Sequence, residues 1–170
     1  MKTIRPFFLC LVLLSCLLNS NAQTQFEVPQ NIELNVASDY EKYEKDIIDA
    51  SKWLEETDLD KEIEKRQQVN NFVLQWISGS PTVTVDITDR LGKIYGKNFQ
   101  LLGVYLASYS RNFLENKGSA TKLPATKAGL ISMMNVYKKG IGIKKAKEME
   151  KLIKLSSDNK FDEYVNENFQ

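Results

Sequence analysis

The sequence contains no histidine, and its only two cysteines, Cys10 and Cys16, lie close to the N-terminus. Histidine is the usual general base near neutral pH and the commonest metal ligand, so a histidine-based catalytic triad and a histidine metal centre are excluded. No Asn-x-Ser/Thr sequon occurs, so nothing indicates a glycosylated eukaryotic surface protein. Enzymes with a histidine-based triad and proteins with a histidine metal centre are therefore not considered further.

Arginine is also scarce, because only Arg66, Arg90 and Arg111 follow residue 22. The formal net charge of the whole sequence is only +1. Nucleic-acid-binding domains normally carry a strongly basic surface rich in arginine and lysine. We therefore expect no nucleic-acid partner.

The longest apolar run stands near the start of the chain, where Lys2 and Arg5 precede residues 7–18 and small residues follow. A basic region, an apolar region and a small-residue end are the three parts of a secretory signal peptide. We expect residues 1–22 to be this signal, with cleavage near Ala22 and release to the periplasm or beyond. Both cysteines would then be removed, leaving no thiol for a disulfide, a metal or a nucleophile.

A bacterial lipoprotein signal is the competing interpretation of the same residues. Residues 13–16 read Leu-Leu-Ser-Cys, which has the form of a lipobox with Cys16 as the lipidated residue. Leu14 is bulkier than the residue usual at its position, and Leu17 and Leu18 continue the apolar region. We favour an ordinary signal peptide over lipidation of Cys16.

The stretch from Asn98 to Gly118 is the most apolar part of the remaining chain, and its apolar residues occupy several faces of a helix. This pattern is typical of a helix surrounded by others, and polar interruptions make the run too short to span a bilayer. Other segments carry apolar residues at i, i+3, i+4 and i+7, with stop signals such as Gly79 and Pro81. The sequence predicts one mainly α domain over residues 38–170, a single compact bundle of five to seven helices.

Residues 23–37 precede the helical domain and are expected to be extended, because Pro29 interrupts them and residues 32–36 alternate between apolar and polar. Thr82 to Ile87 is the clearest strand-like run in the chain, since it is β-branched and alternating. The two alternating runs could pair as one short two-stranded β element. No larger sheet is expected.

Charge is unevenly distributed, with twelve acidic residues and four lysines between Glu33 and Glu64, and seven lysines between Tyr137 and Leu155. The lysines flank an apolar stripe in a helix expected over residues 143–155, as in a helix that lies on an anionic membrane surface or partner. An ordinary surface helix has the same pattern, and the two halves of the domain could instead complement one another. The candidate contacts with an anionic surface are Lys138, Lys139, Lys144, Lys145, Lys147, Lys151 and Lys154.

A small-ligand pocket is the other candidate site, lined by Trp76, Tyr105, Tyr109 and Arg111. Core packing is the more usual role of such aromatic residues. Carboxylates are the remaining catalytic candidates, and those in residues 39–64 alternate with lysines as on solvated helix surfaces. Their acidic turn lacks the glycine and twelfth-position glutamate of a calcium loop. We expect no catalytic residue, no cofactor and no metal site.

Two blocks of sequence are distinctive: WISGSPTVTV at residues 76–85, and KGIGIKK at residues 139–145, followed by KLIKL at residues 151–155. With the Asn-Ala-Gln end of the signal, they resemble small secreted helical proteins of uncharacterised function from Bacteroidota. The resemblance implies an exported bacterial protein with a mainly α fold. It supplies no catalytic residue.

We therefore expect an exported non-enzymatic binding or interaction protein of the bacterial envelope, whose partner is an envelope protein or a small ligand. The alternative is a membrane-surface-associated protein that acts through the lysine-rich helix at residues 143–155 or through a lipidated Cys16. An envelope hydrolase that uses carboxylates alone is a third hypothesis with little support.

Overall fold

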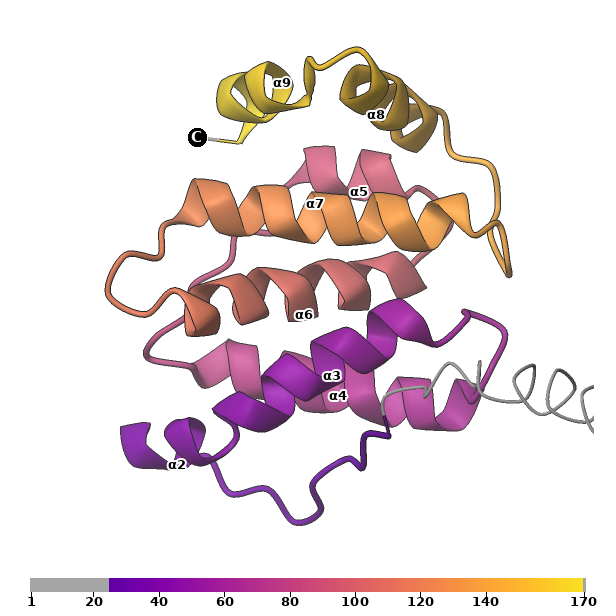
Figure 1. The fold of residues 1–170 in the computed structure, drawn as a ribbon. Helices are drawn as coiled ribbons and strands as arrows, with labels where there is room; N and C mark the ends of the chain where they lie inside the picture. The colour runs from indigo at the N-terminus through magenta and orange to yellow at the C-terminus, as the bar shows by residue number, and fades with distance from the viewer. Residues whose placement is uncertain (1–24, 170) are drawn as a thin grey trace, which may run out of the picture.

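The computed structural model describes residues 25–169, and within this range it contains eight helices and no β-strand (Figure 1). The predicted mainly α fold is confirmed, whereas the expected signal segment lies outside the described residues. No helix in the described range combines the length and apolar character needed to cross a membrane. The helices are α2 (Ala37–Lys42), α3 (Glu44–Glu56), α4 (Ile63–Gly79), α5 (Asp89–Tyr95), α6 (Gln100–Glu115), α7 (Lys122–Lys138), α8 (Lys147–Ser157) and α9 (Phe161–Asn168).

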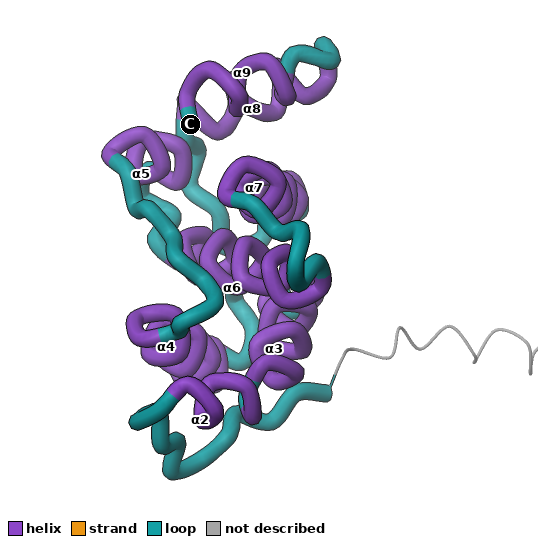
Figure 2. The backbone as a smooth tube through the Cα atoms, turned by 90° about the vertical axis from the view of Figure 1, so that its left-hand side faces the viewer, coloured by secondary structure: helices purple, strands orange, loops and turns teal. Residues whose placement is uncertain are grey.

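The core is built around α6, the helix within the most apolar stretch of the sequence. In Figure 1, α6 lies between α7 and α3, and Figure 2 shows α3 and α4 on the side of α6 away from α7. Its buried side chains include Leu101, Val104, Tyr105 and Tyr109, each at most 2% exposed. Burying one large apolar side chain contributes roughly 1.5–3 kcal/mol, so α6 is a main source of the stability of the fold.

Two glycines let neighbouring helices approach closely at the centre of the bundle. A Cβ atom on Gly103 of α6 would lie 2.0 Å from Oδ1 of Asn70 on α4. A Cβ atom on Gly129 of α7 would lie 3.0 Å from the backbone oxygen of Tyr105. Non-bonded carbon contacts are normally about 3.5–4.0 Å, so a larger residue at either crossing would displace its neighbour.

The eight helices of the described range are one more than the five to seven predicted, and α2 and α3 are separated only by Tyr43. Asp39 organises the start of α2, because its carboxylate pairs with Lys42 (2.7 Å) and accepts hydrogen bonds from the amides of Asn35 (3.0 Å) and Val36 (3.1 Å). The bond to Lys42, followed by the two amide bonds, lowers the pKa of Asp39 from 3.8 to about 2. The start of α2 is thus coupled to the ionisation of one carboxylate.

We predict that NMR titration of the Asp39 carboxyl group will give a pKa of about 2 instead of the ordinary 3.8. Because the folded state favours the ionised form, the bonds to Asn35 and Val36 are complete above about pH 4 and are lost as the pH falls towards 2. Lys42→Met removes the largest cause of the shift and should raise the pKa of Asp39. A wild-type pKa near 3.8, or one that this substitution leaves unchanged, would contradict the assignment.

The prediction of a two-stranded β element is wrong, because backbone groups in both runs have other partners. Ser80 Oγ accepts hydrogen bonds from the amides of Thr82 (3.3 Å) and Val83 (3.2 Å), and the Tyr109 hydroxyl donates to the carbonyl of Thr84 (2.8 Å). In the N-terminal run, the amides of residues 35 and 36 donate to a carboxylate of α2. Residues 25–36 therefore contain neither helix nor strand, and residues 80–88 form an irregular connection between α4 and α5.

The prediction that the lysine-rich helix begins at residue 143 is also wrong, because α8 begins at Lys147. Asn98 Oδ1 accepts a hydrogen bond from the amide of Lys144 (2.7 Å), and Asn98 Nδ2 donates to its carbonyl (2.7 Å). Gly142 just before has a positive φ of 67°. The left-handed conformation of Gly142 interrupts the helical geometry, and the backbone N–H and C=O of Lys144 are already bonded to Asn98. A helix therefore cannot run through these residues. Residues 143–146 therefore precede α8 as a non-helical segment.

Two cations cover the C-terminal end of α3, where the last carbonyl groups have no partner within the helix. One is the guanidinium of Arg66 on α4, which is 2% exposed, and the other is Nζ of Lys139 at the end of α7. The accepting backbone oxygens belong to Leu54, Thr57 and Asp58 for Arg66, and to Glu55 and Glu56 for Lys139. Arg66 and Lys139 thus supply hydrogen-bond donors for backbone oxygens at the end of α3.

Candidate functional site

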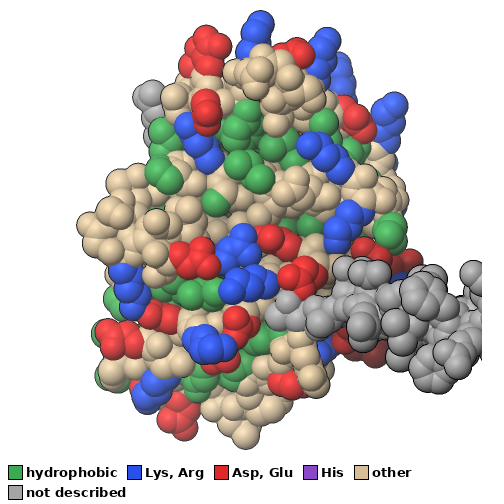
Figure 3. Space-filling view, in the orientation of Figure 1, with side chains coloured by type: hydrophobic (Ala, Val, Ile, Leu, Met, Phe, Trp, Pro, Cys, Tyr) green, Lys and Arg blue, Asp and Glu red, His purple; other side chains and the backbone are tan. Residues whose placement is uncertain are grey.

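The predicted lysine surface is centred on α8, at one end of the molecule (Figure 1). Lys147, Lys151 and Lys154 lie at i, i+4 and i+7 and are exposed, whereas Met149 and Leu152 are at most 1% exposed. The apolar side of α8 therefore packs on the protein while the lysines face outward. In Figure 3, blue side chains project from the upper right of the molecule, where α8 lies.

Most of the predicted lysines form no ion pair with any residue in the range 25–169. Lys139 is the exception, because its Nζ binds the end of α3 and lies 3.6 Å from Oδ1 of Asp58. Lys139 is therefore a structural residue, which corrects its assignment to the anionic contact. Among the predicted lysines, those exposed without an ion pair in this range are Lys138, Lys144, Lys145, Lys147, Lys151 and Lys154.

Acidic residues also lie at this end of the molecule, on α8 and on the neighbouring α9, but none of them forms an ion pair with a lysine of α8 within residues 25–169. Glu150 accepts a hydrogen bond from the Tyr137 hydroxyl (2.7 Å), and Glu148 lines a hollow with residues of α5 and α9. The acid-rich stretch at residues 33–64 forms α2, α3 and the start of α4. Helix α2 lies at the opposite end from α8 in Figures 1 and 2, whereas the acidic turn after α3 lies beside Gly142, where a Cβ atom would be 3.6 Å from the amide nitrogen of Asp60. The charge asymmetry of the sequence is therefore only in part a separation of charge in space, and the distinctive feature of this end is a group of exposed lysines without ion pairs in the described range.

Phe99 and Lys97 extend the lysine surface, although the sequence patterns did not single them out for it. Phe99 is 71% exposed, and Lys97 is exposed without an ion pair in the described range. Both flank Asn98, whose side chain binds the backbone of Lys144. Periodicity could not indicate this role, because Phe99 fits the same apolar pattern as its buried neighbours. We use the name basic surface for Lys97, Lys144, Lys145, Lys147, Lys151 and Lys154.

The predicted aromatic pocket is only partly formed. Tyr105 and Tyr109 line one hollow of about 280 Å³. Trp76 is fully buried, and its indole N–H donates to a backbone oxygen of α2 (2.9 Å). Arg111 lies two positions after Tyr109, and therefore on another side of α6, where it pairs with Glu55 (2.9 Å). The structure thus brings together two of the four predicted residues.

The hollow beside these two tyrosines has little capacity for catalysis. The hydroxyl of Tyr109 donates to the carbonyl of Thr84, and burial raises the pKa of both Tyr105 and Tyr109. Asp86 and Lys122 form an exposed ion pair (2.7 Å) among the lining residues. Neutral buried phenols and a solvated ion pair supply neither an activated nucleophile nor a base.

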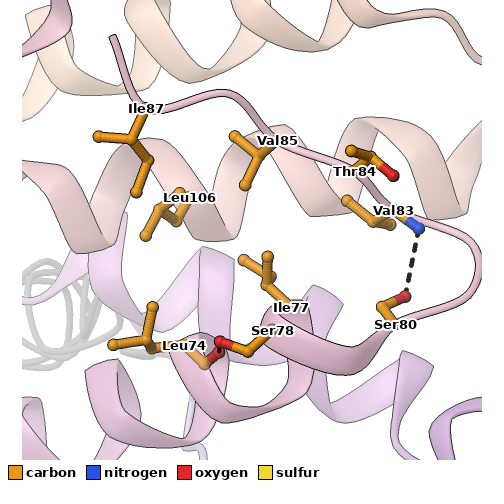
Figure 4. Close-up of a pocket in the computed structure, with 9 residues that line it drawn as sticks. All are labelled: Leu74, Ile77, Ser78, Ser80, Val83, Thr84, Val85, Ile87 and Leu106. Carbon is orange, nitrogen blue, oxygen red and sulfur yellow. Dashed lines mark hydrogen bonds between the residues drawn. The ribbon is translucent and has the colours of Figure 1, made fainter. Parts of the chain in front are cut away.

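A second hollow, of about 330 Å³, lies between α4, the irregular connection and α6 (Figure 4). Its side chains are apolar or carry a hydroxyl, and none is charged. Ser80 Oγ already accepts a hydrogen bond from Val83, drawn as the dashed line in Figure 4. The hollow therefore lacks the convergent polar groups that orient a specific ligand. Its lining residues are Leu74, Ile77, Ser78, Ser80, Val83, Thr84, Val85, Ile87 and Leu106.

A polar network joins α3, α6 and α7. Glu55 accepts hydrogen bonds from Arg111 (2.9 Å) and Ser132 (2.7 Å), and Ser132 Oγ lies 2.8 Å from the buried Ser108 Oγ. This network joins one carboxylate to one guanidinium and two hydroxyls, so it satisfies polar groups between the helices instead of pairing two carboxylates. No cluster of three or more potential metal-binding side chains occurs in the part of the chain that the structure describes.

The chain matches no protein-family model, no curated protein and no solved structure. The basic surface is therefore the feature from which we infer function.

Proposed function

We propose that the protein is an exported, non-enzymatic interaction protein whose basic surface binds an anionic partner in the bacterial envelope. The observation that carries this proposal is the group of exposed lysines without ion pairs. The lysines of the basic surface form no ion pair within residues 25–169, and the first acid-rich helix, α2, lies at the other end of the molecule. Lysines held close together repel one another, and the potential that they create attracts an anionic partner.

The non-enzymatic part of the proposal rests on the chemistry of the side chains. The sequence has no histidine, and both cysteines precede residue 23. Tyr109, which lines one hollow, donates to the carbonyl of Thr84, and the partly buried Glu55 pairs with Arg111 between the helices. Export is proposed from the signal-like sequence of residues 1–22. These features favour a function in binding a partner over a function as an enzyme.

Binding through exposed lysines should be sensitive to salt. The Debye length falls from about 10 Å at 0.1 M salt to about 3 Å at 1 M, so the attraction between exposed charges is largely screened at high salt. Apolar contacts would persist under the same conditions. Salt therefore separates binding by the basic surface from adhesion through exposed apolar side chains.

We predict that a photoreactive side chain at position 147 will cross-link to a partner in intact envelopes, and that one at position 52 will not. Lys147 belongs to the basic surface, whereas Lys52 is an exposed lysine of α3 without an ion pair in the described range. Both substitutions remove one positive charge, so Lys52 is a matched control in the acid-rich half. The adduct from position 147 should disappear at about 1 M salt because screening removes the attraction.

The cross-linking yield decides the proposal. Adducts of equal yield from the two positions would contradict it, as would the absence of any adduct from position 147. A yield unchanged by salt would also contradict it, because contacts between exposed charges must weaken. Mass spectrometry of the adduct then identifies a protein or a lipid as the partner.

A further inference from the structure

We propose that the anionic partner is the surface of an anionic lipid bilayer, and that Phe99 enters the interfacial layer as an apolar anchor. This inference rests on the proposed function and specifies its partner. Phe99 is 71% exposed, which is the largest value among the exposed large hydrophobic residues of the described range. Exposing a phenyl ring to water is unfavourable, and insertion at a bilayer interface would remove that cost.

The position of Phe99 beside the basic surface carries the inference. Lys97 lies two residues before it, and the intervening Asn98 binds the backbone of Lys144 through both polar atoms of its side chain. The ring of Phe99 lies 5.9 Å from that of Tyr95, centroid to centroid. A projecting apolar side chain flanked by lysines fits an anionic interface, where lysines reach phosphate groups and the apolar group reaches the acyl boundary.

The kind of cation favours a bilayer over a folded acidic protein. Every member of the basic surface is a lysine, whereas arginine has the planar fork that binds one carboxylate or phosphate in a fixed geometry. The lysines come from the loop before α6, the segment before α8 and the outer side of α8. Flexible point charges spread over several segments suit the mobile headgroups of a membrane.

The way that α8 packs determines the mode of membrane contact. Met149 and Leu152 are at most 1% exposed, so α8 cannot place its apolar stripe in a bilayer without leaving the core. Its lysines therefore contribute electrostatic attraction, while Phe99 supplies the apolar contact. This differs from an amphipathic helix lying in the membrane, which the sequence pattern by itself suggests.

The charge distribution also defines one orientation on the membrane. Helix α2 and the start of α3 lie away from α8 in Figures 1 and 2, whereas the end of α3 is bound by Lys139. An anionic surface attracts the basic end and repels the acidic one, so the protein should approach with α8 first. Replacing lysines in the acidic half should therefore leave binding almost unchanged.

Vesicle flotation of the mature protein tests the proposal. We expect binding to vesicles that contain phosphatidylglycerol and none to vesicles of phosphatidylcholine alone. The variant K144Q/K145Q/K147Q/K151Q should bind on the order of 1,000-fold more weakly, because each lysine near an anionic surface contributes about 1 kcal/mol. The matched control K42Q/K45Q/K52Q/K61Q removes the same charge from the acidic half and should change binding less than about twofold.

The anchor is tested separately with Phe99→Ser, which should weaken binding about 10-fold through the loss of a buried phenyl ring. Leu74→Ser is its control, because Leu74 is 50% exposed and lies on α4, outside the basic surface. Circular dichroism melting shows whether each variant is folded. The quadruple lysine variant does not alter the core, so it tests the bilayer proposal even if Phe99→Ser is unstable.

Three results would overturn the proposal: no binding to phosphatidylglycerol vesicles, equal losses in the two lysine variants, or full binding by a folded Phe99→Ser variant. If vesicles do not bind while position 147 still cross-links to a protein, the bilayer is wrong and the proposed function stands. If neither experiment gives a signal, the proposed function fails with it.

Discussion

Gly129→Leu is expected to lower the free energy of unfolding by about 3 kcal/mol, because inserted methylene groups over-pack the crossing of α6 and α7 in the core. A Cβ atom at this position would lie 2.6 Å from Cδ2 of Tyr105 and 3.0 Å from its backbone oxygen. The Tyr105 ring is 2% exposed and packs against that of Tyr109, with centroids 5.9 Å apart. The ring borders the hollow that it lines with Tyr109, but the backbone oxygen moves only with α6, so α7 must separate from α6.

Gly92→Ala is the control for Gly129→Leu, since both replace a glycine within a helix. A Cβ atom on Gly92 would meet only the Tyr95 hydroxyl, at 3.8 Å. Alanine favours a helix over glycine by about 0.8–1.0 kcal/mol, so this variant should be as stable as wild type or more stable. Equilibrium unfolding in urea measures both changes. A Gly129→Leu variant with wild-type stability would show that the α6 and α7 contact is not close-packed.

Arg66→Met is the second substitution with a large expected effect, a loss of about 3 kcal/mol in the free energy of unfolding. The Arg66 guanidinium donates to three backbone oxygens at the end of α3 and lies 5.4 Å from the ring centroid of Trp53. Burial lowers the pKa of Arg66, which reflects the cost of removing its charge from water. Methionine keeps much of the packing on Trp53 but leaves the buried oxygens without a donor.

Arg66→Lys and Arg90→Met complete the series. Lysine keeps the charge but cannot span the carbonyl groups as the guanidinium fork does, so Arg66→Lys should lose an intermediate amount of stability. Arg90 is exposed without an ion pair in the described range, so Arg90→Met should change stability by less than about 0.5 kcal/mol. A gain in stability for Arg66→Met would show that desolvating the guanidinium costs more than leaving the oxygens unpaired.

The helical character of the chain could be predicted because helix formation depends on neighbours in sequence. Apolar residues at a 3.6-residue period predicted the buried sides of α4 and α6, and Gly79 with Pro81 predicted the end of α4. The β-branched run at residues 82–87 was misread as a strand. A strand needs a partner for its backbone, and here Ser80 and Tyr109 supply other partners.

The candidate site was predictable where it depends on spacing within one helix, but not where it depends on contacts between distant segments. The stripe of Lys147, Lys151 and Lys154 follows from spacing within one helix, so it was found before the structure was known. Phe99 was read as a core residue, and Lys139 as part of the anionic contact. Their places depend on Asn98 meeting Lys144, 46 residues away in sequence, and on α7 ending beside α3.

The sequence by itself determined that the chain forms helices, that its apolar centre lies near α6 and that charge of opposite sign gathers in different segments. These properties depend on residue type and on spacings of three or four positions, which act within one turn of helix. The tertiary structure alone decided that Arg66 and Lys139 complete α3 and that Phe99 projects beside free lysines. Such placements depend on which distant segments pack together, because burial and partner choice are properties of the assembled core.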